Sequence, residues 1–162
     1  MSNPYTGTVT SALRKSELLL AGQPAQGLQA AALREAALMQ LWRAYLAYLA
    51  ELSFQLQLGL EPQSAAELQQ RLQASAKASG EVAELIALEE DSCSWLTQLQ
   101  ACWRLLWRPG KGNAGAQGGV DLISTGNRAA ANPESLNDDR LRAWHLALQE
   151  LVQRHRAHTE EW

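Results

Sequence analysis

Arg140 and His145 are the residues whose types and spacing could do chemistry in this chain. A histidine can serve as a general acid or base near neutral pH, and an arginine brings a permanent positive charge to an anion. Two residues at such a spacing also occur by chance. The simpler interpretation is a histidine at the edge of the core beside a solvated arginine. Both interpretations depend on the element that carries the pair.

Residues 138–155 are expected to form that element, a helix at the end of the chain. Apolar residues recur there with the i, i+3, i+4, i+7 spacing of one helix face. They are Leu141, Trp144, Leu148, Leu151 and Val152. His145 and a second histidine, His155, fall on the same stripe. An apolar stripe of this length needs other helices to cover it, so the pattern predicts a helical bundle.

The segment Arg140-Leu-Arg-Ala-Trp-His145 is similar to the Arg-x4–6-His signature of HEPN-type helical RNases. In that family the motif lies at the start of a late helix. The resemblance implies that Arg140 and His145 would act on a scissile phosphate in a dimer cleft. Leu141 stands where the family often has a polar residue. One hypothesis for the chain is therefore a metal-independent RNase that uses Arg140 and His145.

Four further helices are expected before the last one. Their expected ranges are 4–21, 25–58, 64–79 and 81–107, with a break or kink near residue 91 in the last of these. The run from Ala44 to Ala50 carries no charge at any angle, which is typical of a central helix that others surround. Leu46 in this run is expected to be buried. Ser64 and Glu67 have the spacing of a capping box and predict a helix start.

Residues 109–132 form a Gly- and Ala-rich stretch that is longer than compact domains usually tolerate without structure. We expect a flexible loop there. Its Gly110-Lys111-Gly112 segment lacks the Ser or Thr of a phosphate loop and follows a helix rather than a strand. The predicted fold class is all-α: a single domain, residues 1–162, folded as an antiparallel bundle of about five helices with this long Gly-rich loop before the last.

A broader resemblance covers most of the chain, and packing motifs carry it. The motifs are Leu20-Ala21-Gly22, Arg34-Glu35-Ala36-Ala37-Leu38, Ser94-Trp95-Leu96, Arg142-Ala143-Trp144 and Leu148-Gln149-Glu150-Leu151. In this order they resemble a family of small uncharacterised proteins from pseudomonads. The resemblance implies a cytoplasmic bacterial protein with a domain of unknown function. It transfers no functional residue, because none of its motifs has an assigned activity.

Six tryptophans are many for 162 residues. Most of them fall on apolar helix stripes, which favours core packing over stacking on nucleic-acid bases. Arg104, Arg108, Lys111 and Arg128 make a modestly basic region near the long loop. This region could contact phosphate, but it is also typical of a solvated helix end. The formal net charge of −3 provides no general attraction to nucleic acid or to acidic lipid.

Cys93 and Cys102 are expected to share one helix, ~13 Å apart at the helical rise, which is too far for a disulfide. Reduced thiols are typical of the cytoplasm. The chain begins without the basic and apolar regions of a secretory signal. Its most apolar stretch, residues 36–50, is shorter than the ~20 residues of a membrane span. Because the sequence has neither Glu-x-x-His motifs nor cysteines at metal-ligand spacing, no metal and no cofactor are expected.

The absence of a catalytic motif favours a non-enzymatic function. The leading hypothesis is an intracellular protein-interaction or regulatory module that binds a protein partner or a second copy of itself. Nucleic acid is the weaker partner class, and a membrane is not expected. The HEPN-like RNase with Arg140 and His145 as catalytic residues is the alternative.

Overall fold

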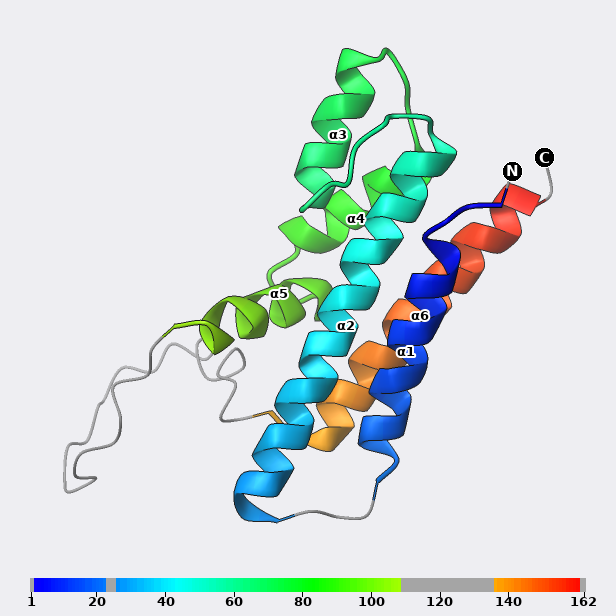
Figure 1. The fold of residues 1–162 in the computed structure, drawn as a ribbon. Coiled ribbons are helices and arrows are strands. Elements are labelled where there is room, and N and C mark those ends of the chain that lie inside the picture. The colour runs from blue at the N-terminus through cyan, green and yellow to red at the C-terminus, as the bar shows by residue number, and fades with distance from the viewer. Residues whose placement is uncertain (1, 23–25, 109–135, 161–162) are drawn as a thin grey trace, which may run out of the picture.

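The computed structural model describes residues 2–22, 26–108 and 136–160, and this part of the chain is all-helical (Figure 1). Its helices are α1 (Thr6–Leu20), α2 (Gly27–Gln55), α3 (Ala65–Ala74), α4 (Gly80–Glu90), α5 (Trp95–Leu106) and α6 (Asp138–Glu160). The predicted all-α class is confirmed. The flexible loop expected over residues 109–132 lies outside the described residues.

The described helices number six where about five were expected, because the break predicted near residue 91 is complete. α4 ends at Glu90, and Ser94 begins a new helix by accepting a hydrogen bond from the Thr97 backbone N–H at 3.1 Å. A serine in extended conformation at this position satisfies one of the free donors of the first turn. The chain therefore changes direction between α4 and α5.

The three long helices α1, α2 and α6 lie side by side, and α3, α4 and α5 cover the other side of α2 (Figure 1). α1 runs antiparallel to α2, while α6 runs in the same direction as α2 (Figure 1). One hydrophobic core draws on all six helices. α2 is its centre, as the uncharged run predicted: among residues 44–50 every side chain is buried except Leu46.

Leu46 is half-buried, so the expectation that it lies in the core was wrong. It lines a hollow of about 660 Å³ that also contacts Tyr5, Trp42 and Trp103. No helix covers this side of α2 at that point in the described part of the chain. The uncharged surface of α2 is therefore covered by neighbouring helices on most sides but not on all.

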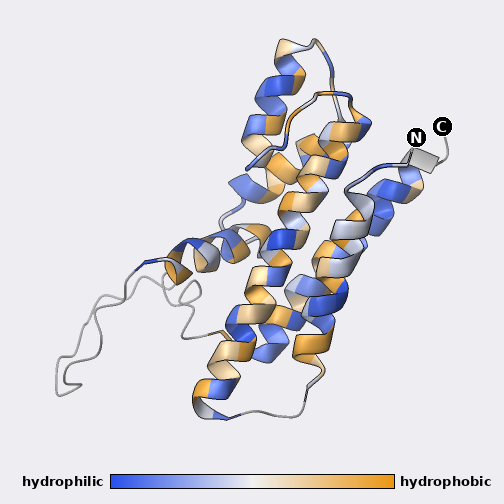
Figure 2. Ribbon diagram, in the orientation of Figure 1, coloured by the Kyte–Doolittle hydropathy of each residue, from blue (hydrophilic) through white to orange (hydrophobic). Residues whose placement is uncertain are grey.

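The capping box that begins α3 is present in part. Ser64 Oγ accepts a hydrogen bond from the Glu67 backbone N–H at 3.2 Å, as predicted. The Glu67 carboxylate accepts from the N–H of Gln63 rather than of Ser64, at 2.8 Å. α3 ends at Ala74, earlier than expected, and Ala76 follows with a positive φ of 53°. Figure 2 shows hydrophilic residues over much of the outer side of this peripheral helix.

The two cysteines do not share a helix, which corrects the sequence prediction. Cys93 is exposed in the turn between α4 and α5, and Cys102 is buried on α5. Both are free thiols. The helix break near residue 91 separates them, because the segment that was expected to continue through Cys93 turns there.

The tryptophans also differ from the core-packing prediction. Trp144 on α6 is buried, as expected. Trp42, Trp95 and Trp103 are only half-buried, and Trp107 is 63% exposed. Helical periodicity identified the face of each tryptophan, but the neighbouring helices do not cover the outer part of that face. Trp162 lies outside the described residues.

Candidate functional site

His145 is buried between α6 and α1, where its Nδ1 atom lies 2.7 Å from Ser16 Oγ. The Ser16 hydroxyl donates its proton to the Leu13 carbonyl at 2.8 Å, so the imidazole donates its Nδ1–H to Ser16 Oγ. Burial lowers the pKa of His145 below its usual value, and the charge of Glu17 opposes this only in part. The described geometry is that of a neutral histidine joining two helices.

Arg140 and His145 are directed to different neighbours. Five residues along a helix correspond to a rotation of roughly 140° about its axis. The charge of Arg140 acts on Cys102 of α5, where it opposes the larger effect of burial that raises the pKa of that thiol to about 11. His145 instead meets Ser16 of α1. The RNase hypothesis that rests on this pair stays a prediction, and the geometry adds no support to it.

His155, the second histidine of the stripe, joins three helices. Its Nε2 atom lies 2.8 Å from Glu84 Oε2 of α4, and its Nδ1 atom contacts the Tyr48 hydroxyl of α2. Since an ionised carboxylate only accepts, Nε2 donates to Glu84, and the Tyr48 hydroxyl is the hydrogen-bond partner of Nδ1. Glu84 also pairs with Arg154. Sequence reasoning placed His155 on the apolar face but had no means of finding partners on α2 and α4.

The order carboxylate, imidazole, hydroxyl is the order that activates a nucleophile in many hydrolases. Tyr48, however, is only 1% exposed, so no substrate can reach its oxygen in this conformation. Burial raises the pKa of Tyr48 well above its usual value, and the carboxylates of Glu51, Glu81 and Glu84 add to that effect. A neutral, enclosed phenol suits a link between helices better than a reacting group.

Glu51 is a buried carboxylate on α2, and it is fully paired. The Arg156 guanidinium of α6 donates two hydrogen bonds to it, at 2.8 and 2.7 Å, and the Thr6 hydroxyl donates a third at 3.3 Å. Such a bidentate pair compensates part of the cost of removing the charge from water. The candidate acid–base groups of the core, His145, His155 and Glu51, are therefore held by internal partners.

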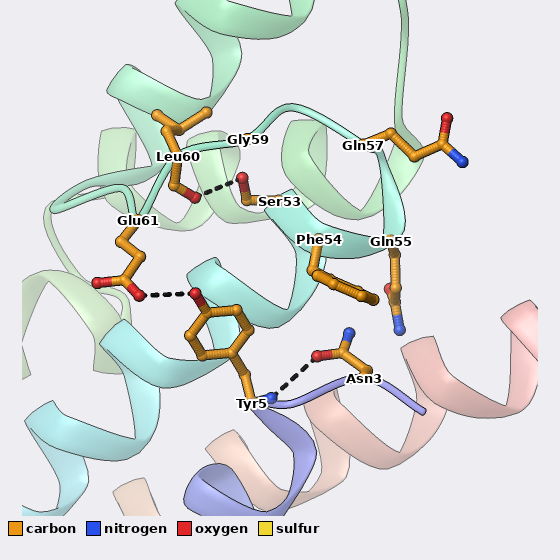
Figure 3. A pocket seen from close by; sticks show the side chains of 9 residues that line it. All are labelled: Asn3, Tyr5, Ser53, Phe54, Gln55, Gln57, Gly59, Leu60 and Glu61. Carbon is orange, nitrogen blue, oxygen red and sulfur yellow. Dashed lines mark hydrogen bonds between the residues drawn. The ribbon is translucent and has the colours of Figure 1, made fainter. Parts of the chain in front are cut away.

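A pocket of about 950 Å³ lies near the start of α1 and the end of α2 (Figure 3). Its walls are the segment before α1, the last turn of α2 and the loop that follows. The residues that line it are Asn3, Tyr5, Ser53, Phe54, Gln55, Gln57, Gly59, Leu60 and Glu61. Gly59 has a positive φ of 68°, which allows the loop to turn back toward α2.

The polar groups of the pocket wall largely bind one another (Figure 3). The Tyr5 hydroxyl donates to Glu61 Oε1 at 2.6 Å, and this hydrogen bond is the main reason that the pKa of Tyr5 is raised. Ser53 Oγ donates to the Leu60 carbonyl at 2.7 Å. Phe54 stays 38% exposed beside them. The pocket thus offers apolar contact area on a wall whose conformation these hydrogen bonds hold.

A second hollow, the one that contains Leu46, shares Tyr5 and Glu61 with the pocket and extends along α2.

The described residues contain no group of three or more His, Cys, Asp or Glu side chains placed to hold a metal ion. Among the described helices, none has the length and apolar character needed to cross a membrane.

A sequence model described as "Family of unknown function (DUF6586)" matches residues 6–162, nearly the whole chain. No curated protein and no solved structure matches the chain.

Proposed function

The chain belongs to DUF6586, a family of unknown function, and we propose that it is a non-enzymatic binding module that receives a segment of a protein partner in the pocket of Figure 3. The observation that carries this proposal is the contrast in accessibility. His145, His155 and Glu51 are buried and internally paired, while the pocket of about 950 Å³ has an accessible apolar wall.

The chemistry of the pocket indicates what it binds. Phe54, Leu60 and the ring of Tyr5 provide contact area for an apolar side chain. The side-chain amide of Gln55 has no hydrogen-bond partner in the described part of the chain, and it lies next to Phe54 (Figure 3). It can therefore bind the backbone of an incoming segment. Glu61 at the rim favours a partner with N–H donors or a basic side chain.

The cytoplasm of a bacterium is the proposed location. The free thiols of Cys93 and Cys102 support it, because exposed thiols persist in reducing compartments. The resemblance to pseudomonad proteins implies the bacterial origin.

Affinity capture from native lysate, with and without nuclease, tests the proposal. Phe54→Glu places a charge in the pocket, and Leu146→Glu places the same charge at an exposed leucine on α6, outside the pocket. We expect a protein that wild type and Leu146→Glu retain after nuclease treatment and that Phe54→Glu loses. If the partner is a second copy, sedimentation will show a dimer that Phe54→Glu dissociates. A set of retained proteins that Phe54→Glu leaves unchanged would refute the proposal.

A further inference from the structure

Three tryptophan rings contact one another in sequence where α5 packs on α2. Trp42 of α2 stacks on Trp103 of α5, with ring centroids 5.6 Å apart and an interplanar angle of 18°. Trp103 in turn meets Trp107 edge to face, at 5.3 Å and 77°. Exposure increases along the series, from the half-buried Trp42 and Trp103 to Trp107, which is 63% exposed. These three residues are called the tryptophan ladder below.

Each tryptophan of the ladder is followed in the sequence by an arginine. These arginines are Arg43, Arg104 and Arg108. All three are exposed, and in the described part of the chain none of their guanidinium groups forms an ion pair or a hydrogen bond. Other arginines of the structure are used differently. Arg14, Arg34, Arg142, Arg154 and Arg156 each pair with a carboxylate.

The two helices that form the ladder carry no carboxylate close to it in sequence, and Glu61, which lines the same hollow as Trp42, Arg43 and Trp103, accepts from the Tyr5 hydroxyl. α5 contains no Asp or Glu, and α2 contains none between Glu35 and Glu51. The formal net charge of the chain is −3, so this positive charge is a local property of one surface. An exposed indole flanked by unpaired guanidinium groups combines a flat stacking surface with sites for anions.

We propose that the tryptophan ladder and its three arginines bind single-stranded nucleic acid. The exposed ring of Trp107 would stack on a base, and Arg43, Arg104 and Arg108 would contact the phosphates on either side. Stacking on a π-face does not depend on base identity, so little sequence preference is expected. A peptide of acidic residues alone could use the arginines, but it has no aromatic group to stack on the indole. The ladder does not include Phe54, so this proposal is independent of the pocket in Figure 3.

Fluorescence anisotropy with labelled 12-nucleotide oligo-U and oligo-dT tests the proposal. A 12-residue poly-glutamate peptide of similar charge and a 12-base-pair duplex serve as comparison probes. We expect both single strands to bind more tightly than the duplex or the peptide. Three phosphate contacts on a single strand predict a slope of log K against log salt of about −2. Failure to bind either single strand, or equal binding of poly-glutamate, would overturn the proposal.

Two sets of variants measure separately how base stacking and how positive charge contribute to binding. Trp107→Ala should weaken single-strand binding by about tenfold or more. The double variant Arg104→Gln/Arg108→Gln should make the salt slope shallower by about 1.4, since two phosphate contacts are lost. Leu146→Ala and Arg71→Gln are the controls, because Leu146 is an exposed apolar residue and Arg71 an exposed arginine without an ion pair in the described part. Both controls should bind as wild type does.

All of these positions are exposed, so circular dichroism should show unchanged folding. Binding that Trp107→Ala leaves unchanged, or that Arg71→Gln weakens as much as the double variant does, would contradict a site at the ladder. Sedimentation of wild type and Trp107→Ala provides a further check. A dimer that becomes a monomer in Trp107→Ala would assign the ladder to contact between copies and overturn the proposal.

Discussion

Arginines on two sides of the same bundle have opposite situations. On α6, the partly buried Arg156 pairs with Glu51 of α2, whose carboxylate is buried. On the other side, Arg104 of α5 and Arg108 just after its end are exposed and have no ion pair in the described part of the chain. A charge that lies between helices has to be matched by an opposite charge, because burial removes its water. A charge on an open surface is under no such constraint and is available for a ligand.

The aromatic residues also fall into a buried, hydrogen-bonded group and an accessible group. Tyr45 and Tyr48 lie on the buried side of α2, and their hydroxyls bind Glu89 at 2.6 Å and His155, respectively. Trp42, three residues before Tyr45, opens the tryptophan ladder on the accessible side. α2 therefore combines buried side chains that tie the bundle together with a half-buried tryptophan that leads to an accessible surface. Substitutions at buried and at accessible positions should have very different effects.

Arg156→Ala should have the largest effect on stability. It leaves the buried carboxylate of Glu51 with only the Thr6 hydroxyl, and the loss of one partner of a buried ion pair costs about 3–5 kcal/mol of unfolding free energy. Arg104→Ala, the matched change on α5, should stay within about 0.5 kcal/mol. Urea denaturation measures both. Equal effects of the two substitutions would erase the contrast between the sides.

Leu49→Ala and Leu46→Ala compare a buried and a half-buried leucine of α2 directly. Leu49 is fully buried, so its truncation should cost about 2–5 kcal/mol through lost burial and the cavity that remains. Leu46 is half-buried beside the hollow, so its truncation should cost about 1 kcal/mol. The same denaturation experiment checks this order. A larger loss for Leu46→Ala would show that the hollow is filled by protein.

The buried His145 should make the bundle sensitive to mild acid. Its pKa in the folded state is lowered, so the unfolded state takes up its proton first. The contribution of His145 to the free energy of unfolding is complete above the usual histidine pKa of about 6.5. This contribution is lost as the pH falls below that value. His145→Asn, which keeps an N–H donor for Ser16, should show a smaller loss of urea midpoint between pH 7 and pH 5. The pKa of Glu81 is lowered mainly by the Ser79 hydroxyl, so protonation of Glu81 should reduce the stability only at more acidic pH.

The two thiols report on the turn before α5 and on the buried side of α5 without perturbing the fold. Cys93 is exposed, whereas Cys102 is buried and its pKa is raised to about 11, so little thiolate forms at neutral pH. An aromatic disulfide reagent should therefore modify one thiol quickly in native protein and the second only on unfolding. Cys93→Ser should remove the fast phase and leave the melting temperature nearly unchanged. Two fast phases would place the inner face of α5 in contact with solvent.

Several features of this molecule followed from local pattern alone. The apolar spacing around Leu141 and Leu148 predicted α6, and the uncharged run after Ala44 predicted the central helix. Ser64 and Ser94 marked helix starts, because a serine hydroxyl can satisfy a free backbone donor only a few residues away. These signals are local, since hydrogen bonding and helical periodicity involve residues within a few turns.

The sites depended on tertiary structure. Tyr48, Glu84 and His155 lie far apart in the sequence, and only the packing of α2, α4 and α6 brings them into contact. The pocket of Figure 3 forms because the loop after α2 returns to the start of α1. The tryptophans illustrate the boundary most clearly. Periodicity showed which helix face each tryptophan occupies. Its exposure, however, is decided by whether another helix covers that face. Neighbouring helices cover Trp144 but leave most of Trp107 exposed.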